Sequence, residues 1–366
     1  MARILNKQDI LEMAYGACLL AGGGGGSLDN AIQILDEMDA KKKIAVEMIT
    51  VDEIERGRYV GTCGGMGSPL KFKERGANCI DEPVFAFRAL ERVGHQMNRK
   101  VSYIMALEYG ALNTVLPYMV AFECGVPVVD ADGTGRAVPS IQTLLYGINE
   151  VPIAPFVMAD MNENITITYP SDPLNAAYLD VVGRHMCMAS DMVMGVAFAI
   201  VSAEDIKTKL VPDAYVDAQA IGKAMLKAKA DKTDVFDELE KAVKCKELFR
   251  GKITKFINES RGGWDFGAIH VEGSGKYKGK TYSIDIQNES LVAYEGKKVL
   301  MTVPDIITAI NLDTGDPSSN ADFSEGMNIS VIGIPVHDNW FISDRGVNFW
   351  QYHFDAVGYK GGIVRY

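Results

Sequence analysis

Apolar and polar residues alternate in two different patterns along this chain, and the pattern changes near residue 248. Before that point, several stretches repeat apolar residues every three or four positions, which predicts amphipathic helices. Shorter apolar runs between them predict buried strands. The expected helices are 9–20, one from about residue 29, 81–94, 109–125, 174–199, 205–210, 217–229 and 236–248, and the expected strands are 44–50, 59–62, 101–106, 126–129, 151–157 and 164–168. Alternating strands and helices indicate a layered α/β domain.

After residue 248, apolar residues alternate with polar ones in short runs that Gly, Asn and Asp separate. This alternating pattern predicts an all-β barrel or sandwich. A chain of 366 residues is also too long for one ordinary core. We therefore expect two domains: an α/β domain in residues 1–247, with a helical segment at 174–247, and a β-domain in residues 248–366.

Composition and charge disfavour some classes of binding partner. The chain is 48% hydrophobic and 23% charged, with a formal net charge of -11. This charge disfavours nucleic acid and anionic membranes, because both need clustered Lys and Arg. No apolar run reaches the length of about 18 residues that a membrane span needs, and the first residues have a helical rather than a secretory pattern. Six cysteines without a CxxC pair are typical of free thiols. We therefore expect a cytoplasmic protein.

The most suggestive chemistry follows a short buried strand in the first half. Asp130 and Asp132 lie in a glycine-punctuated turn that Arg136 closes. Such a pair could hold a divalent metal, act as a general base or bind N–H groups of a ligand, or it could cap the turn by accepting backbone amides. Glu108 ends the preceding strand and Asn113 begins the next helix. Since strand ends meet at one edge of a parallel sheet, we expect these side chains to converge on a site.

Two glycine-rich stretches could form walls of such a site. One has five consecutive glycines at 22–26 between two helices, and the other is a turn at 63–69. Neither contains the GxGxxG fingerprint or the GK[ST] of a nucleotide site, so we expect no nucleotide cofactor. Each is either a flexible turn or a loop whose bare backbone contacts a small ligand. The expected ligand contacts are Gly24, Gly25, Gly65, Gly67 and Ser68.

Other candidate residues carry less specific signals. The five histidines are dispersed without zinc-binding spacing, and the sequence shows no nucleophile–base pair beside the aspartates. A metal assembled from distant residues stays open. In the second half, Gln287, Asn288 and Glu289 interrupt an alternating strand. These three polar groups need partners, either in a ligand or in the other domain.

Several motifs together resemble one known family. They are AGGGGGS at 21–27, GGMGSP at 64–69, Glu82, EYGALN at 108–113, PVVDADGTGRAVP at 127–139, QNESL at 287–291 and PDIITAI at 304–310. The most specific of them is the string that contains DADGTGRAVP. With these motifs the chain resembles the S-methyl thiohydantoin desulfurase family, whose genes are often found near those of hydantoinase and oxoprolinase-type proteins. The resemblance covers nearly the whole chain.

The resemblance implies a three-layer α/β sandwich domain followed by a β-barrel domain. It also implies hydrolysis of an S-methylated thiohydantoin to a hydantoin, with release of methanethiol. On this basis Asp130 or Asp132 would be the general base, directly or through a metal-bound water, with Glu108 as a third catalytic residue. The expected substrate contacts, besides the glycine loops, are Asn113, Arg136, Asn288 and Glu289.

The cofactor and the assembly stay open at this point. A divalent metal such as zinc, held by Asp130 and Asp132, is one alternative. We expect a cyclic amide or thioimidate as the small-molecule partner, and a homodimer or larger assembly. Two other functions are also open: a cyclic-amide hydrolase associated with a hydantoinase or oxoprolinase, and a non-catalytic partner subunit of such an enzyme. The glycine loops and the converging strand ends favour a small-molecule site in each case.

Overall fold

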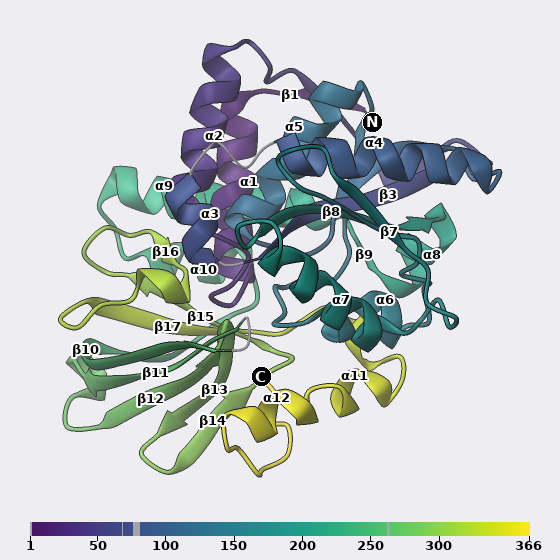
Figure 1. The fold of residues 1–366 in the computed structure, drawn as a ribbon. Coiled ribbons are helices and arrows are strands. Elements are labelled where there is room, and N and C mark those ends of the chain that lie inside the picture. The colour runs from purple at the N-terminus through teal and green to yellow at the C-terminus, as the bar shows by residue number, and fades with distance from the viewer. Residues whose placement is uncertain (1, 68, 76–80, 262–263) are drawn as a thin grey trace.

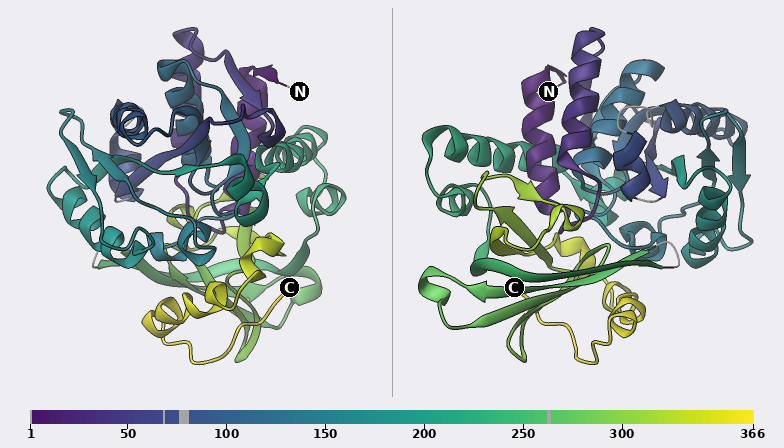
Figure 2. Two further views of the ribbon diagram at one scale, coloured as in Figure 1. Left: turned by 90° about the vertical axis from the view of Figure 1, so that its right-hand side faces the viewer. Right: turned by 60° about the vertical axis from the view of Figure 1, so that its left-hand side comes forward.

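The protein has a mixed α/β fold in which helices surround one sheet and a second, antiparallel sheet lies apart from it (Figure 1). The computed structural model describes residues 2–67, 69–75, 81–261 and 264–366. Figure 2 shows the second sheet and the last helices on the side of the molecule opposite the N-terminal helices. Among the described helices, none has the length and apolar character that crossing a membrane requires.

The first sheet, sheet A, mixes parallel and antiparallel pairs. Its strands are β1 (Arg3–Leu5), β2 (Val46–Ile49), β3 (Tyr59–Gly67), β4 (Val101–Ala106), β5 (Val128–Asp132), β6 (Phe156–Ala159), β7 (Ile165–Thr168), β8 (Val193–Val201) and β9 (Val211–Pro212). Their order is β1-β2-β5-β4-β3-β8-β6-β7, with β9 paired to β5. Strands β2, β5, β4 and β3 run parallel. The carboxyl ends of β3, β4 and β5 therefore meet at one edge of the sheet, as the sequence predicted.

Helices cover sheet A and pack closely on one another. They are α1 (Lys7–Leu20), α2 (Leu28–Ala40), α3 (Pro69–Arg75), α4 (Asp81–Gln96), α5 (Ala111–Cys124), α6 (Leu145–Ile148), α7 (Ala176–Met188), α8 (Ala203–Lys209), α9 (Ala214–Asp231) and α10 (Val235–Ala242). Helix α4 packs on β3, β6 and β8, and α1 packs on α5 and α9. A Cβ atom at Gly16 of α1 would lie 1.8 Å from the carbonyl oxygen of Ala218 in α9. Only glycine allows these two helix backbones to approach so closely.

The second sheet, sheet B, is antiparallel throughout. Its strands are β10 (Lys246–Arg261), β11 (Trp264–Gly273), β12 (Thr281–Gln287), β13 (Glu289–Glu295), β14 (Lys298–Thr302), β15 (Ile306–Asn311), β16 (Pro317–Ser318) and β17 (Asn328–Ile334). The order is β14-β13-β12-β11-β10-β17-β15-β16. The two end strands do not pair with each other within the described residues, so the expected barrel is not confirmed. Short helices α11 (Arg345–Asn348) and α12 (Gln351–Ala356) follow the sheet.

Several predictions of local structure were wrong. The helix expected at 236–248 ends at Ala242 and is followed by β10 from Lys246, and the strand expected at 151–157 begins only at Phe156. The stretch 174–199 is not one helix, because α7 ends at Met188 and β8 begins at Val193. The expected turn at 63–69 belongs largely to β3, which continues to Gly67. The last aromatic run of the chain, at 349–359, does not alternate in a strand but contains α12. The domain boundary expected between residues 247 and 248 stays a prediction.

The two sheets share much of their buried surface. One continuous apolar cluster contains residues from α1, from sheet A and from β13, β15 and β17. A second, smaller cluster lies within sheet B and includes Phe249, Tyr282 and Ile329. Because the larger cluster crosses from one sheet to the other, the surfaces between them are held as firmly as a core, and a site built there keeps its geometry.

Candidate functional site

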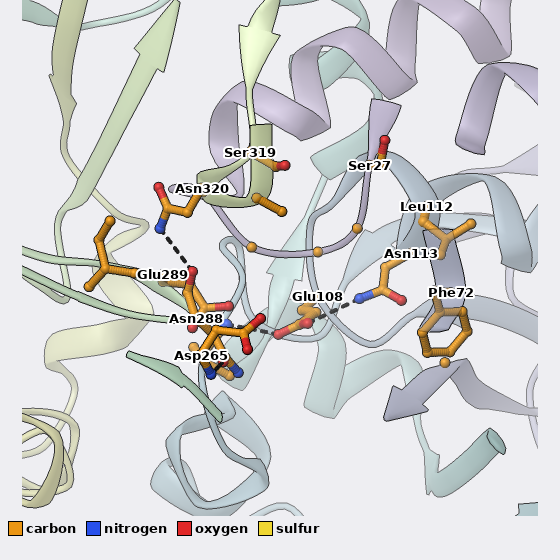
Figure 3. A pocket seen from close by; sticks show the side chains of 18 of the residues that line it. Ser27, Phe72, Glu108, Leu112, Asn113, Asp265, Asn288, Glu289, Ser319 and Asn320 are labelled. Atoms are coloured by element: carbon orange, nitrogen blue, oxygen red, sulfur yellow. Dashed lines mark hydrogen bonds between the residues drawn. The ribbon is translucent and has the colours of Figure 1, made fainter. Parts of the chain in front are cut away.

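A cavity of about 150 Å³ lies where the edge of sheet A meets sheet B (Figure 3). Both halves of the chain contribute to its walls. The glycine loop at 23–26 passes over it, and the start of α5 and the end of β3 form one side. Its lining also contains Ser27, Phe72, Glu108, Leu112, Asn113, Val138, Phe256, Asn258, Asp265, Ile286, Asn288, Glu289, Ser319, Asn320 and Ala321.

Glu108 lies near the middle of this cavity, two residues beyond the end of β4 (Figure 3). Its side chain is 8% exposed. Oε1 accepts a hydrogen bond from Asn113 Nδ2 at 3.0 Å, and Oε2 accepts one from the backbone N–H of Val138 at 2.9 Å. Burial, together with the nearby Glu289 carboxyl, raises the pKa of Glu108 well above its ordinary value. Glu108 and Asn113 thus lie together, as expected from the strand ends, whereas Asp130 does not line this cavity.

Glu289, the first residue of β13, faces the same cavity from sheet B. It is 3% exposed, and its Oε2 has no hydrogen-bond partner among the described residues. Burial raises the pKa of Glu289 to about 8, although the Arg136 charge opposes the shift. A Cβ atom at Gly24 would lie 2.0 Å from Glu289 Oε1. The carboxyl group is therefore packed directly against the glycine loop, and a larger residue at position 24 would have to displace it.

Asn288 links the two halves of the cavity wall. It lies between the end of β12 and the start of β13, and its backbone has a left-handed φ of 54°. Its Oδ1 accepts the backbone N–H of Asp265 at 2.9 Å, and its carbonyl oxygen accepts from Asn320 Nδ2 at 2.8 Å. The Nδ2 group of Asn288 has no acceptor among the described residues, so it is free to donate to a ligand.

The glycine loop is tied down by its carbonyl groups. Those of Gly22, Gly23 and Gly25 accept backbone hydrogen bonds from Ser290, Asn320 and Asn113, respectively. In contrast, the N–H groups of residues 23–27 have no acceptor in the part of the chain that the structure describes. The buried Oγ of Ser27, at the start of α2, is also without a partner there. Unpaired donors beside a helix N-terminus suit a carbonyl oxygen or an anion.

Asp130 and Asp132 lie at the end of β5 but line neither this cavity nor the second one described below. Asp130 accepts the backbone N–H groups of Tyr215 and Val216 at the start of α9, at 2.7 and 3.3 Å. Asp132 Oδ1 accepts the N–H groups of Thr134 and of the next residue, at 2.8 and 2.6 Å. Of the readings that the sequence left open, capping of backbone amides is the one seen in this geometry.

The donor atoms of these aspartates do not suit a divalent metal. One oxygen of each is already occupied by backbone amides. No group of three or more His, Cys, Asp or Glu residues converges anywhere in the described ranges. A divalent ion needs several such ligands, and zinc usually takes at least three from the protein. We therefore derive no step through a metal.

Arg136 is fully buried between the two sheets rather than in the cavity wall. Its Nη1 donates to the carbonyl oxygens of Pro304 and Asp305 at 2.6 and 3.2 Å, and its guanidinium lies 5.0 Å from the centre of the Trp350 ring. Burial lowers the pKa of Arg136 to about 10, while the Glu289 carboxyl counteracts the shift. The side chain remains charged at neutral pH and balances one negative charge among the buried carboxyl groups.

A second cavity of about 130 Å³ shares part of this wall. Residues common to both cavities are Gly65, Gly67, Glu108, Val138 and Asn288. The predicted contacts Gly65 and Gly67 thus lie between the two spaces. Ser68 lies outside the described residues. Cys63 is buried, and burial raises its pKa well above the ordinary value, so it is not a ready nucleophile.

The sequence missed a buried hydrogen-bonded chain beside the second cavity. Ser140 Oγ lies 3.0 Å from His353 Nε2, and His353 Nδ1 lies 3.0 Å from Gln287 Oε1. The spacing of Ser140 and His353 resembles a nucleophile–base pair, although it lies beside the second cavity rather than beside the aspartates. However, burial and then the Arg184 charge lower the pKa of His353 to about 3. Such an imidazole is a weak base, so we assign the chain a structural role. Its members lie 213 and 66 positions apart, and no local signal could reveal them.

The remaining cavity residues were also absent from the sequence prediction. Phe72, Leu112 and Ile286 give apolar walls, and Asp265 and Asn320 support Asn288. Leu112 was within reach of sequence reasoning, because it directly precedes the predicted Asn113 on α5. The others come from elements whose meeting depends on the tertiary fold.

Comparison with known proteins shows the family and a similar solved structure. A family model described as S-Me-THD-like, N-terminal domain, matches residues 8–169, and one described as S-Me-THD-like, C-terminal domain, matches residues 175–357. The chain is also similar to a protein from Chromobacterium violaceum whose crystal structure was determined by a structural genomics consortium. The two are 25% identical over 99% of each chain, with a TM-score of 0.84. No curated protein matches the chain.

Proposed function

The chain belongs to the S-Me-THD-like family, and we propose that it is a hydrolase that removes methanethiol from an S-methyl thiohydantoin and leaves a hydantoin. The observation that carries the proposal is the presence of two buried carboxyl groups, Glu108 and Glu289, on the walls of one small cavity. Titratable groups with raised pKa values in a cavity are typical of acid–base catalysis.

The reaction needs water to add to the ring carbon that carries the methylthio group. A C–O bond forms and the C–S bond breaks. Of the two water protons, one ends on the departing sulfur and the other on the ring nitrogen. The step therefore requires a group that takes a proton from water and a group that gives one to sulfur or nitrogen, both working near neutral pH.

The hydrogen bonds suggest which carboxyl group has which role. Burial raises the pKa of Glu108 as well, and the nearby Glu289 carboxyl adds to that shift, so the two groups do not both ionise near neutral pH. Of the two, Glu108 accepts N–H groups on both oxygens, which favours its ionised form over that of Glu289, so we assign Glu108 as the general base. Glu289 has a pKa of about 8 and an Oε2 without a partner among the described residues. It is therefore protonated at neutral pH, and we assign it as the general acid. The buried charge of Arg136 offsets the single carboxylate that this arrangement leaves.

Polar groups around the pair would orient the ring. The unpaired N–H groups of residues 23–27 would donate to a ring carbonyl oxygen and stabilise the negative charge that develops there during water attack. The free Nδ2 of Asn288 is a second donor, and the Oδ1 of Asn113, whose Nδ2 holds Glu108, is an acceptor for a ring N–H.

The size of the cavity agrees with a small ring. A dry protein cavity of about 150 Å³ can hold benzene. The first cavity has this volume, and the second adds about 130 Å³ on the far side of Glu108. A five-membered ring with a methylthio group would fill the first space, and a ring substituent could extend toward the second.

The test is release of methanethiol from an S-methyl thiohydantoin by the purified protein. Glu108→Gln and Glu289→Gln should each lower the rate roughly 10²–10⁴-fold, the usual contribution of a general acid or base. Glu272→Gln, at an exposed position of β11, is the matched control. Full activity in both cavity variants would refute the assignment. Asp132→Asn separates this arrangement from the one expected from the sequence, since a loss as large as that of Glu108→Gln would favour Asp132 as the base.

The other functions make different predictions in the same assay. A cyclic-amide hydrolase would open the ring of a plain hydantoin and release no thiol. A partner subunit would turn over neither compound unless a hydantoinase or oxoprolinase-type enzyme were added. The buried acid–base pair favours an enzyme over a partner subunit. Burying two carboxyl groups beside each other lowers the stability of the fold, and such groups are typical of catalytic sites.

A further inference from the structure

The cavity that holds Glu108 has two chemically different ends (Figure 3). Phe72 and Leu112 lie on one side of Glu108, together with Asn113. The opposite side carries the polar side chains of Asp265, Asn288, Glu289 and Asn320. The lining residues Phe256 and Ile286 belong to β10 and β12 of sheet B, the sheet that also contributes Asp265 and Glu289. A ligand that is apolar at one end and polar at the other would therefore have a preferred orientation in this cavity.

The Phe72 side of the cavity is tightly fixed. Asn30 Nδ2 in α2 donates to the carbonyl oxygen of Phe72 at 2.8 Å and so anchors α3. A Cβ atom at Gly65 would lie 2.7 Å from the Phe72 ring, and one at Gly26 would lie 2.5 Å from Leu112 Cβ. Phe72 and Leu112 are 7% and 3% exposed. Both side chains are therefore buried and pack directly against a glycine backbone, so we expect this wall to limit the size of the group beside it.

We propose that Phe72 and Leu112 form the subsite for the S-alkyl group of the substrate, and that they restrict this group to methyl. The inference rests on the proposed function. A thioether is apolar and polarizable, and sulfur makes favourable contacts with an aromatic ring at a separation of about 5 Å. Ring N–H and C=O groups find partners at the opposite end, at Asn288 and at the first part of the glycine loop, where Gly23 and Gly24 pack against Asn320 and Glu289.

This orientation also suits the reaction. The carbon that is attacked lies between the methylthio group and the ring nitrogens. With sulfur against Phe72, that carbon lies over the middle of the cavity, where Glu108 is placed to activate water. In the reversed orientation, the methylthio group would displace ring groups from their polar partners and leave buried donors unpaired.

The experiment compares two S-alkyl substrates, S-methyl and S-propyl thiohydantoin, with a matched pair of variants. Leu112→Ala and Ile286→Ala each remove three carbon atoms, but from opposite ends of the cavity. The wild type should prefer S-methyl by at least about tenfold in kcat/KM, the usual effect of a misfitting methylene group. Leu112→Ala should reduce this preference by about tenfold or more, whereas Ile286→Ala should keep it. A loss of preference in Ile286→Ala alone, an equal loss in both or no loss in either would overturn the proposal.

Two further measurements keep the result interpretable. Leu112→Val and Ile286→Val remove one carbon each and replace the alanine variants if these do not fold. Binding of both compounds to the Glu108→Gln protein, measured by calorimetry with and without the wall substitutions, reports the same preference without turnover. Absence of thiol release with a clear binding preference would refute the proposed reaction but not the subsite. Thiol release without a preference that Leu112→Ala changes would refute the subsite but not the reaction.

Discussion

Asp132 offers a direct test of the electrostatics at the end of β5. The residue is fully buried, and its Oδ2 has no hydrogen-bond partner among the described residues. Burial raises its pKa from 3.8 to about 7, although hydrogen bonds from the N–H groups of Gly135 and Thr134 oppose the shift. Asp132→Asn keeps the Oδ1 acceptor for both N–H groups and removes the titration. The substitution therefore isolates the cost of ionising this carboxyl group in the folded protein.

The sign and size of the effect follow from the shift in pKa. Below about pH 4, Asp132 is protonated in both the folded and the unfolded chain, so it has no pH-dependent cost. As the pH rises from about 4 to about 7, the unfolded chain loses the proton first, and the folded state loses stability. A shift of about 3 pKa units at about 1.4 kcal/mol per unit gives about 4 kcal/mol, fully developed above pH 7. Asp132→Asn should also leave an amide unpaired, at a constant cost of about 1–3 kcal/mol.

Equilibrium urea unfolding at pH 4, 5.5, 7 and 8.5 measures this difference. The variant should be less stable than the wild type at pH 4 and equal to it or more stable at pH 8.5, with a total swing of about 4 kcal/mol. Asp160→Asn is the control without a titration in this range. Burial alone would raise the pKa of Asp160, but hydrogen bonds from Asn164 and Asn162 lower it. The stability that this lower pKa contributes develops below about pH 4, so the difference between the control and the wild type should stay nearly constant from pH 4 to 8.5. A swing below about 1 kcal/mol for Asp132→Asn would refute the reasoning.

Three shorter predictions concern the cavity and its surroundings. Gly24→Ala should lower thiol release at least about tenfold, because its Cβ atom would lie 2.0 Å from Glu289 Oε1 and displace that carboxyl group. Gly362→Ala is the control and should leave thiol release unchanged, because its Cβ atom would meet no described atom within 4 Å. Thiol release should fall as the pH rises through about 8, where Glu289 loses its proton, and residual activity in Glu289→Gln should lack this alkaline limb. Arg136→Lys keeps the charge but cannot reproduce the guanidinium bonds to Pro304 and its neighbours, so it should destabilise the protein by about 1–3 kcal/mol in urea unfolding. An unchanged unfolding midpoint would contradict the last of these.

The sequence predicted most of the elements before residue 170, because their apolar residues have a clear period and their ends carry recognisable signals. Helix α5 ends where Gly125 adopts a left-handed φ of 67°, as expected of glycine at a helix terminus. The strand β8 was mistaken for helix because all nine of its residues are buried. A strand covered on both faces reads as a continuous apolar run, which periodicity cannot separate from a buried helix.

Positions in the candidate site could be anticipated only where they depend on strand ends. Glu108 and Asn113 were expected to lie together because the ends of parallel strands converge, and the structure places both in one cavity wall. Their roles stay predictions. The catalytic role expected of the aspartates stays a prediction, but their hydrogen-bond partners could not be seen in the sequence. Asp130 accepts N–H groups of α9, which lie 85 and 86 positions further along the chain. An acidic pair at a strand end looks the same in sequence whether its oxygens face a ligand or a distant helix terminus.

The run of glycines shows why this cavity needs both halves of the chain. Its carbonyl groups accept hydrogen bonds from α5 on one side and from the β13 and η5 (Asn320–Asp322) segments of the second half on the other. Side chains at Gly23, Gly24 or Gly25 would collide with Asn320, Glu289 or Gly110, respectively. Glycine is therefore required here for close packing between the halves, and the same packing uses the carbonyl groups and leaves the N–H groups of the loop unpaired. Separation of the two halves would remove Glu289 and the support of the loop together, so we expect neither half alone to bind a substrate.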